Sequence, residues 1–164
     1  MKVLVTGGTG YIGSHTVLEL LNAGYDTVVL DNLCNSSEES IRRVEQITGK
    51  KAAFYKADIR DEEAMNRIFE AERPDAVIHF AGLKAVGESV QIPLEYYDNN
   101  ITGTLTLLRA MRRTDCRNIV FSSSATVYGK PETVPIREDF PLSATSPYGR
   151  TKLMIEKMID ELKE

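Results

Sequence analysis

Short apolar runs alternate with amphipathic stretches along the 164 residues of this chain. The short runs have the length of buried strands, and the longer stretches have the apolar spacing of helices that cover a sheet. The pattern predicts strands at residues 3–6, 27–30, 52–57, 76–80 and 118–122. It predicts helices at residues 11–23, 38–47, 62–72, 94–113 and from 147 to the C-terminus. Strands that alternate with helices through right-handed connections form a doubly wound parallel sheet, so the predicted fold class is α/β.

Capping and turn residues set the predicted ends of these elements. The predicted caps are Gly24 after the first helix and Ser37, Asp61 and Ser146 before three later ones. Pro93 and Pro147 stand where a helix begins, a position that tolerates the missing N–H group. Residues 82–87 and 129–146 are predicted to be loops, the first containing glycine and the second three prolines.

Composition narrows the class of partner. The formal net charge of −4 disfavours a nucleic-acid-binding protein, which usually carries a basic stripe. No apolar run approaches the ~20 residues that span a bilayer, and the N-terminus lacks the features of a signal peptide. We therefore expect neither nucleic acid nor a membrane as a partner. Cys34 and Cys116 have no metal-ligand spacing, so we expect no metal and two free thiols in a reducing cytoplasm.

A glycine-rich turn, Thr-Gly-Gly-Thr-Gly-Tyr-Ile-Gly at residues 6–13, follows the first strand and opens the first helix. In this context Gly7 allows a tight turn, Gly10 lets the backbone approach phosphates, and Gly13 lets the helix pack closely on the strand. The N–H groups and dipole of the helix attract the pyrophosphate of a dinucleotide. The turn therefore predicts a Rossmann sheet that binds a dinucleotide.

Two acidic positions follow predicted strands. Asp31 lies 18 residues after Gly13. A carboxylate there accepts hydrogen bonds from the ribose hydroxyls of adenosine and repels a 2′-phosphate, so we expect NAD rather than NADP. The alternative is a plain glycine turn with a surface aspartate. Asp58 and Ile59 end the third strand and are predicted to flank the adenine, unless Asp58 only caps its own segment.

Tyr148 and Lys152 are spaced to share one face of the last helix. A nearby ammonium favours the ionised phenolate that a general base requires. Ser124 follows the fifth strand at the carboxyl edge, where doubly wound sheets bind ligands, and its hydroxyl can share a proton with Tyr148. Taken alone, the Tyr and Lys pair is more often a solvated helix surface. His15 and His79 have no partner pattern and are predicted to be structural.

These residues together resemble the short-chain dehydrogenase/reductase superfamily, in which Ser, Tyr-x-x-x-Lys and this glycine turn occur together. The stretch that carries the Tyr and Lys reads Tyr-Gly-Arg-Thr-Lys at residues 148–152. Within the superfamily, four further stretches look closely like the UDP-galactose 4-epimerase family, also called UDP-glucose 4-epimerases. They are residues 31–36, 80–89, 93–100 and 122–129, in the expected order.

The resemblance implies residue roles, position by position. Its implied cofactor contacts are Gly7, Gly10, Tyr11, Ile12 and Gly13 at the pyrophosphate, Asp31, Asn32, Asn35 and Ser36 at the adenosine, Asp58 and Ile59 at the adenine, Phe80, Ala81, Gly82, Lys84 and Asn99 along the middle, and Ser124, Tyr148 and Lys152 at the nicotinamide end. Ser124, Tyr148 and Lys152 are also the implied catalytic residues. Strand ends such as Phe80 and Ala81 pack the core with or without a ligand, and Asn99 is alternatively a polar helix residue.

The reaction that the resemblance implies is inversion at C4 of a UDP-hexose. Tyr148 removes the proton of the C4 hydroxyl, NAD takes the C4 hydride, and the hydride returns to the other face of the sugar. Related 4,6-dehydratases carry an acidic pair after the strand-five Ser or Thr, whereas this chain has Ala125 and Thr126 there. Elimination therefore lacks its proton carriers. The alternatives are an inactive NAD-binding fragment, another NAD-dependent sugar-nucleotide enzyme such as a dehydratase, or a redox-sensing regulator.

Members of this family continue beyond the length of this chain. We expect residues 1–164 to be one NAD-binding domain, C-terminally truncated relative to the family, that alone binds NAD weakly and shows negligible turnover. The final helix is more apolar than one face requires. The resemblance implies that it and the helix at 94–113 meet their copies in a homodimer, through residues 94–113 and 147–162. The alternative is that these residues pack only on the sheet.

Overall fold

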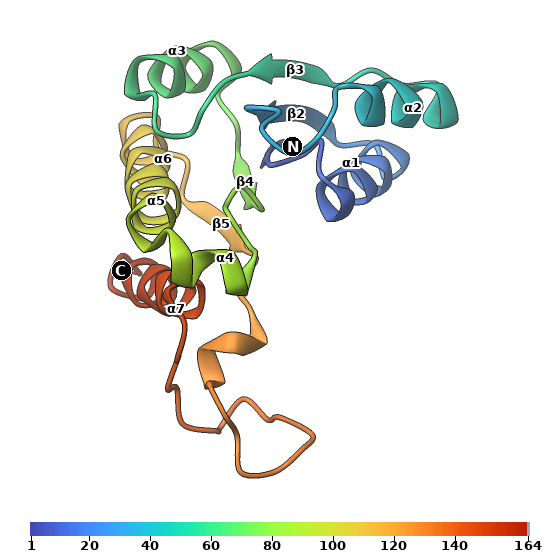
Figure 1. The fold of residues 1–164 in the computed structure, drawn as a ribbon. Coiled ribbons are helices and arrows are strands. Elements are labelled where there is room, and N and C mark those ends of the chain that lie inside the picture. Colours follow the sequence, from blue (N-terminus) through green and yellow to red (C-terminus); the bar gives the residue numbers. More distant parts are fainter. Residues whose placement is uncertain (164) are drawn as a thin grey trace. The chain divides into compact units, whose positions relative to one another are not determined.

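The computed structural model describes residues 1–163 and divides into two compact units (Figure 1). Unit 1 contains Met1–Ala81 and Leu105–Ser122, and it holds all the strands of the described chain. Unit 2 contains Gly82–Thr104 and the chain from Ser123 onward, and it is helical with long connections.

Unit 1 is built on a five-stranded sheet in which each strand pairs in parallel with its neighbour. The strands are β1 (Lys2–Thr6), β2 (Asp26–Asp31), β3 (Ala53–Lys56), β4 (Ala76–His79) and β5 (Asn118–Phe121). Their order across the sheet is β3-β2-β1-β4-β5. The order reverses direction at β1, as in a doubly wound sheet, so the predicted fold class is confirmed.

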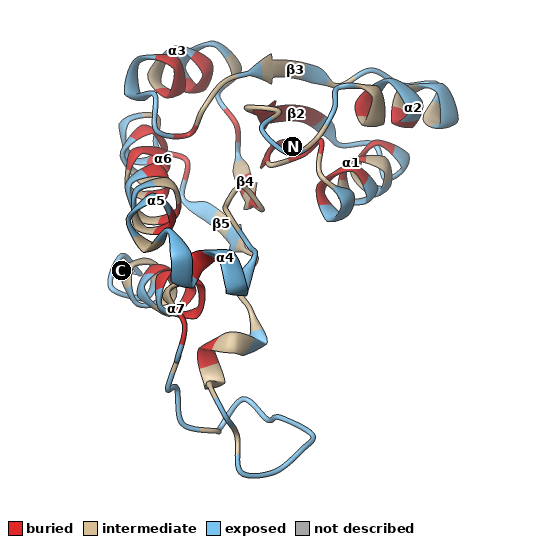
Figure 2. Cartoon of the chain, in the orientation of Figure 1, coloured by how far each residue is buried: buried red, intermediate tan, exposed pale blue. Residues whose placement is uncertain are grey.

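Helices cover both faces of this sheet. On one face α1 (Tyr11–Asn22) and α2 (Glu39–Thr48) pack on Val3, Val5 and Val29. On the other, α3 (Glu62–Glu72) and the later part of α6 (Gly103–Arg113) pack on Leu4, Val28, Leu30 and Val77. Neighbouring residues of one strand thus enter opposite cores, which is why the strands read as continuous apolar runs. Figure 2 shows a buried β2 and the buried inner faces of these helices, whereas β3 and β5, the two outer strands, are intermediate or exposed.

Unit 2 is organised around α7 (Pro147–Asp160). This helix contacts α4 (Val86–Gln91), α5 (Pro93–Tyr97), the π-helical turn η1 (Asp98–Thr102) and the 3₁₀ turn η2 (Ala125–Tyr128). Tyr96 and Ile155 are the largest fully buried side chains of unit 2.

The caps behave largely as predicted. The Asp61 carboxylate accepts from the Ala64 N–H at the start of α3, and the Ser146 hydroxyl accepts from the Gly149 N–H at the start of α7. Gly24 adopts φ +84° after α1, as a C′ residue does. Ser37 differs, because α2 begins at Glu39 with Glu38 as its N-cap. The Ser37 hydroxyl still accepts from the Glu39 N–H.

One other prediction is wrong in part, and a second misses a local change of helix type. The predicted loop at 82–87 already contains the start of α4, because Val86 and Gly87 are helical. The predicted continuous helix at 94–113 is α5, η1 and α6 in succession, with a π-helical turn at its centre. The turn contains Asn100, whose side chain bonds residues remote in sequence. Local apolar spacing carries no signal for such long-range bonds.

The cysteines differ in environment. Cys34 is exposed, whereas Cys116 is buried among the residues that α3 and α6 bring to the sheet. Burial raises the pKa of the Cys116 thiol. Within residues 1–163, no cluster of His, Cys, Asp and Glu is arranged to hold a metal ion. No helix in the same range is both long and apolar enough to cross a membrane.

Candidate functional site

The glycine turn of unit 1 follows β1 and opens α1. Gly7 adopts φ +69°, which a side chain disfavours, and a Cβ there would lie 2.7 Å from the Ala81 nitrogen. A Cβ on Gly13 would lie 2.2 Å from the Gly7 carbonyl oxygen. Gly10 is the N-cap of α1 and provides no side-chain hydrogen bond to the helix. The first turn of α1 thus lacks a side-chain cap. The glycines before it carry no side chains, so an anion can approach the N–H groups of this turn.

Gly13→Ala should unfold or distort this turn. The added methyl group overlaps backbone atoms of Gly7 and Gly8, which cannot move as a flexible side chain can. We expect a loss of at least about 2 kcal/mol in the free energy of unfolding, measured by urea denaturation. Gly87→Ala in α4 is the matched control, because a Cβ there meets nothing within 4 Å. Equal stability of the two variants would contradict the packing role of Gly13.

Asp31 is buried at the end of β2 and joins the glycine turn to the loop after β2. Its carboxylate accepts from the Thr9 N–H at 3.2 Å, the Leu33 N–H at 2.9 Å and the Ser36 hydroxyl at 3.1 Å. Since a carboxylate has about four acceptor positions, these bonds leave about one for a ligand hydroxyl. Asn35 is exposed on the same loop.

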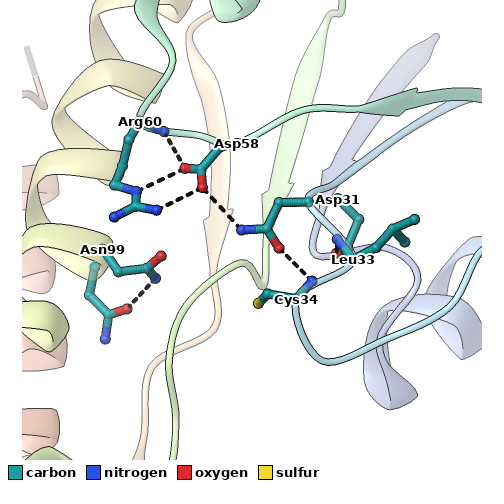
Figure 3. Close-up of polar contacts among 8 residues, drawn as sticks. Asp31, Leu33, Cys34, Asp58, Arg60 and Asn99 are labelled. Carbon is teal, nitrogen blue, oxygen red and sulfur yellow. Dashed lines mark hydrogen bonds and ion pairs between the residues drawn. The ribbon is translucent and has the colours of Figure 1, made fainter.

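A second polar network lies next to that loop (Figure 3). The Arg60 guanidinium donates to both carboxylate oxygens of Asp58, at 3.0 and 2.9 Å, and Asn32 donates to Asp58 at 3.1 Å. The guanidinium holds the pKa of Asp58 well below its usual range. Asp58 also accepts from the Arg60 N–H, so the local cap is present, and the Ile59 side chain is buried in the core.

The carboxyl ends of β1 and β4 are tied together. The Thr6 hydroxyl and the His79 Nδ1 atom are 2.6 Å apart, and the Ala81 N–H donates to the same hydroxyl at 3.3 Å. Phe80 and Ala81 are partly buried against the two cores. His79 thus contacts a residue on a neighbouring strand. In α1, the His15 Nδ1 atom lies 2.8 Å from the Tyr11 carbonyl oxygen.

The exposed side chains of unit 1 that the resemblance assigns to the pyrophosphate are Tyr11 and Ile12, which are 78% and 58% exposed. Both lie in the first turn of α1 and leave the turn open to a ligand.

In unit 2, the segment after β4 is held by a side chain of η1. Asn100 donates to the Leu83 carbonyl oxygen and accepts from the Leu83 N–H, at 3.0 and 2.8 Å. The Asn99 side-chain amide donates to the side-chain oxygen of Asn100, Oδ1, at 3.0 Å. A Cβ on Gly82 would lie 3.2 Å from that same Oδ1 atom, while Lys84 is exposed.

Ser124 is the N-cap of η2. Its hydroxyl accepts from the Thr126 N–H at 3.2 Å and from the Thr126 hydroxyl at 2.9 Å. Thr126 in turn packs on α7, where a Cβ on Gly149 would lie 2.9 Å from the Thr126 carbonyl oxygen. Ser123 donates to the Glu156 carboxylate, a second link between this segment and α7.

Tyr148 and Lys152 lie one turn apart on α7, and both are buried. The Lys152 ammonium nitrogen is 5.8 Å from the centroid of the Tyr148 ring, within the range of a cation–π contact. Burial lowers the pKa of Lys152 from 10.5 to about 8. This pair is therefore not a solvated helix surface.

Sequence reasoning missed residues that place the predicted ones. Asn100 and Tyr96 bond the segment after β4, and Thr126 bonds Ser124. The bonds of Asn100 and Tyr96 depend on tertiary structure and leave no local signal.

The sequence is similar to those of known proteins over almost its whole length. The family model described as GDP-mannose 4,6 dehydratase matches residues 4–164. The Bacillus subtilis protein named UDP-glucose 4-epimerase is 64% identical over 162 residues, covering 99% of this chain and 48% of the relative. The Dictyostelium discoideum protein of the same name is 62% identical, covering 98% of this chain and 47% of the relative. The chain thus spans about half the length of these curated relatives.

A solved structure has the same fold. It is the Bifidobacterium longum UDP-glucose 4-epimerase in complex with NAD+ and UDP, with a TM-score of 0.97 and 53% identity. The match covers 99% of this chain and 49% of that one.

Proposed function

We infer that this chain, which belongs to the GDP-mannose 4,6 dehydratase family, forms the NAD-binding part of an enzyme that interconverts UDP-glucose and UDP-galactose. The observation that carries the proposal is the buried pair on α7, with the Lys152 ammonium 5.8 Å from the Tyr148 ring centroid. A buried cation beside a buried phenol is costly for a fold and is useful for moving a proton.

The residues of unit 1 fit a dinucleotide. The turn at Gly7, Gly10 and Gly13 has no space for side chains at its first and last glycines, and α1 has no side-chain cap. Its free N–H groups and helix dipole suit a pyrophosphate. Asp31 retains about one acceptor position for a ribose hydroxyl. We propose that the predicted contact residues around the glycine turn bind the pyrophosphate, and that those around Asp31 bind the adenosine.

In unit 2, Tyr148 acts on the substrate as the general base and then as the general acid. Its phenolate takes the proton of the sugar C4 hydroxyl and gives it back after inversion. The Lys152 ammonium stabilises the phenolate, and Ser124 shares a hydrogen bond with the same substrate oxygen. NAD, when bound, supplies the acceptor that takes the C4 hydride and returns it to the opposite face of the 4-keto sugar.

Local residues favour inversion at C4 over dehydration, although the family model carries the name of a dehydratase. After Ser124 stand Ala125 and Thr126, which have no acid or base at neutral pH. The Thr126 hydroxyl donates to Ser124, so it is engaged in holding that residue. The names of the Bacillus subtilis and Dictyostelium discoideum relatives support the same choice.

The test is a chimera in which residues 1–164 replace the matching part of the Bacillus subtilis enzyme. We expect it to convert UDP-galactose to UDP-glucose and to retain NAD through purification. A folded, NAD-containing chimera without turnover would refute the proposed reaction. The isolated 164-residue chain, assayed in parallel, is expected to bind NAD weakly and to show negligible turnover.

The chain should prefer NAD over NADP. The buried Asp31 carboxylate lies where a 2′-phosphate would meet a like charge. We expect an affinity for NAD at least about tenfold higher, equivalent to about 1.4 kcal/mol, measured by isothermal titration with both cofactors. Equal affinities, or tighter binding of NADP, would show that Asp31 does not read the ribose.

We also propose a homodimer through residues 94–113 and 147–162, in a reducing cytoplasm. Leu94, Met154 and Leu162 are 78%, 46% and 58% exposed, which suits a surface that a second copy covers. A monomeric mass at micromolar concentration by light scattering would count against the dimer.

Cys34 and Cys116 are free thiols, which is compatible with the proposed reducing cytoplasm.

A further inference from the structure

Thr126 occupies both acceptor positions of the Ser124 hydroxyl. The Ser124 oxygen accepts from the Thr126 N–H at 3.2 Å and from the Thr126 hydroxyl at 2.9 Å. A hydroxyl group has two acceptor positions and one donor, so what remains of its bonding capacity is its own O–H. The first bond is the ordinary cap of the turn η2, whereas the second bond needs a hydroxyl at residue 126 and is not required by the turn.

The position of Thr126 is set by α7. A Cβ on Gly149 would lie 2.9 Å from the Thr126 carbonyl oxygen and 3.1 Å from its hydroxyl oxygen, so this close approach needs a glycine at residue 149. The N–H of Gly149 donates to the Ser146 hydroxyl at 3.1 Å, which fixes the first turn of the helix. The Thr126 hydroxyl therefore lies beside the turn of α7 that carries Tyr148.

The residue before Ser124 is fixed to the same helix. Ser123 donates to the Glu156 carboxylate, which lies about two turns beyond Gly149 on α7. The backbone on both sides of Ser124 is thus held against α7, and the freedom left at Ser124 is the rotation of its own side chain. The bonds from Thr126 restrict that rotation, because a change of rotamer would break both of them at once.

We propose that Thr126 is a positioning residue that makes Ser124 a fixed hydrogen-bond donor to the C4 oxygen of the sugar. The inference rests on the proposed function for the roles of Ser124 and Tyr148. A relay through Ser124 would need a free acceptor position on its oxygen, and both positions are filled by Thr126.

The proton therefore moves from the C4 hydroxyl directly to the Tyr148 phenolate, while the C4 hydrogen leaves as hydride to the nicotinamide. The O–H bond of Ser124 stays intact throughout. It donates to the oxygen that becomes the 4-keto group, where negative charge develops during the transfer.

The experiment compares Thr126→Val, Thr126→Ser, Ser124→Ala and the double variant Ser124→Ala/Thr126→Val in the chimera. Valine keeps the shape of threonine without its hydroxyl, and serine keeps the hydroxyl. The measurements are kcat and KM for UDP-galactose, with bound NAD quantified. In the 164-residue chain, NMR couplings between the α and β protons give the rotamer populations of Ser124 without substrate or cofactor. Thr114→Val is the control, since this partly buried hydroxyl of unit 1 donates to the Ala110 carbonyl oxygen.

We expect Thr126→Val to lower kcat by about 10- to 100-fold, the loss that a misplaced catalytic contact produces. KM should stay within about twofold, because the bond to the C4 oxygen strengthens mainly in the transition state. Thr126→Ser should recover most of the rate. The double variant should be no slower than Ser124→Ala, because the effect of Thr126 passes through Ser124. Thr126→Val should also populate several rotamers of Ser124, whereas the parent, Thr126→Ser and Thr114→Val keep one.

A Thr126→Val variant with the parent kcat, or with a single Ser124 rotamer, would overturn the inference. A double variant at least about tenfold slower than Ser124→Ala would do the same, because Thr126 would then act by another route. Thr126→Ala, which lacks the hydroxyl and adds no bulk, takes the place of the valine variant if that one fails to fold. A parent chimera without turnover would count against the proposed function, while the Ser124 rotamers still decide whether Thr126 holds this side chain.

Discussion

Tyr148→Phe in the chimera lowers kcat by about 10²–10⁴-fold, the range that a positioned general acid or base contributes. The ring and its contact with the Lys152 ammonium remain, so the packing of α7 and the content of NAD are expected to stay as they were. Only the hydroxyl that exchanges the proton with the sugar is lost. The measurement is the rate of UDP-glucose formation from UDP-galactose, with bound NAD quantified in the same samples.

Tyr55→Phe is the control for this variant. The Tyr55 hydroxyl donates to Glu72 at 2.5 Å within unit 1. It is no part of the proposed catalytic group, which belongs to unit 2. Its loss should leave kcat unchanged. A Tyr148→Phe variant that kept more than about a tenth of the parent kcat would assign the proton transfer to another group.

Lys152→Met stabilises the cofactor-free chain at neutral pH. The pKa of Lys152 is lowered from 10.5 to about 8 by burial, so below pH 8 the folded protein carries a buried ammonium at its full cost. Between pH 8 and 10.5 the folded state has released this proton while the unfolded state still binds it, so stability rises with pH. At 1.36 kcal/mol per pH unit, the cost removed by the substitution at pH 7 is about 3 kcal/mol.

The measurement is urea denaturation of parent and variant at pH 7 and near pH 10.5. The gain should be largest at pH 7 and should shrink toward the higher pH. Lys130→Met, at an exposed position, is the control and should change little at either pH. NAD binding by Lys152→Met is expected to weaken, so the more stable chain is the poorer binder. A variant that is less stable than the parent at pH 7 would contradict the desolvation cost assigned to the buried ammonium.

The elements were predictable where a local pattern decides them. Asp61 and Ser146 cap the helices that their spacing predicts, and the apolar runs give the five strands to within about two residues. The glycine turn was predictable because Gly7 and Gly13 serve short-range geometry within one strand, turn and helix. The π-helical turn within the helix at 94–113 was not, since η1 lies where Asn100 bonds Leu83 and Thr151.

The site residues divide in the same way. Spacing placed Tyr148 and Lys152 on one face of α7, and the structure adds that both are buried. The predicted place of Ile59 beside a ligand stays a prediction, while its side chain is in the core. Tyr96 could not be singled out, because a tyrosine in an apolar stretch has the same pattern whether or not its hydroxyl holds a backbone.

The two cysteines allow local opening of unit 1 to be measured by thiol labelling. An exposed Cys34 reacts with a thiol reagent in the native protein, whereas Cys116 must first leave the core between the sheet, α3 and α6. The number of thiols alkylated in a fixed time therefore counts molecules that have opened, with Cys34 as the internal standard in each. Because both residues are native, the free energy of local opening around Cys116 can be followed in the unaltered chain, with and without a dinucleotide.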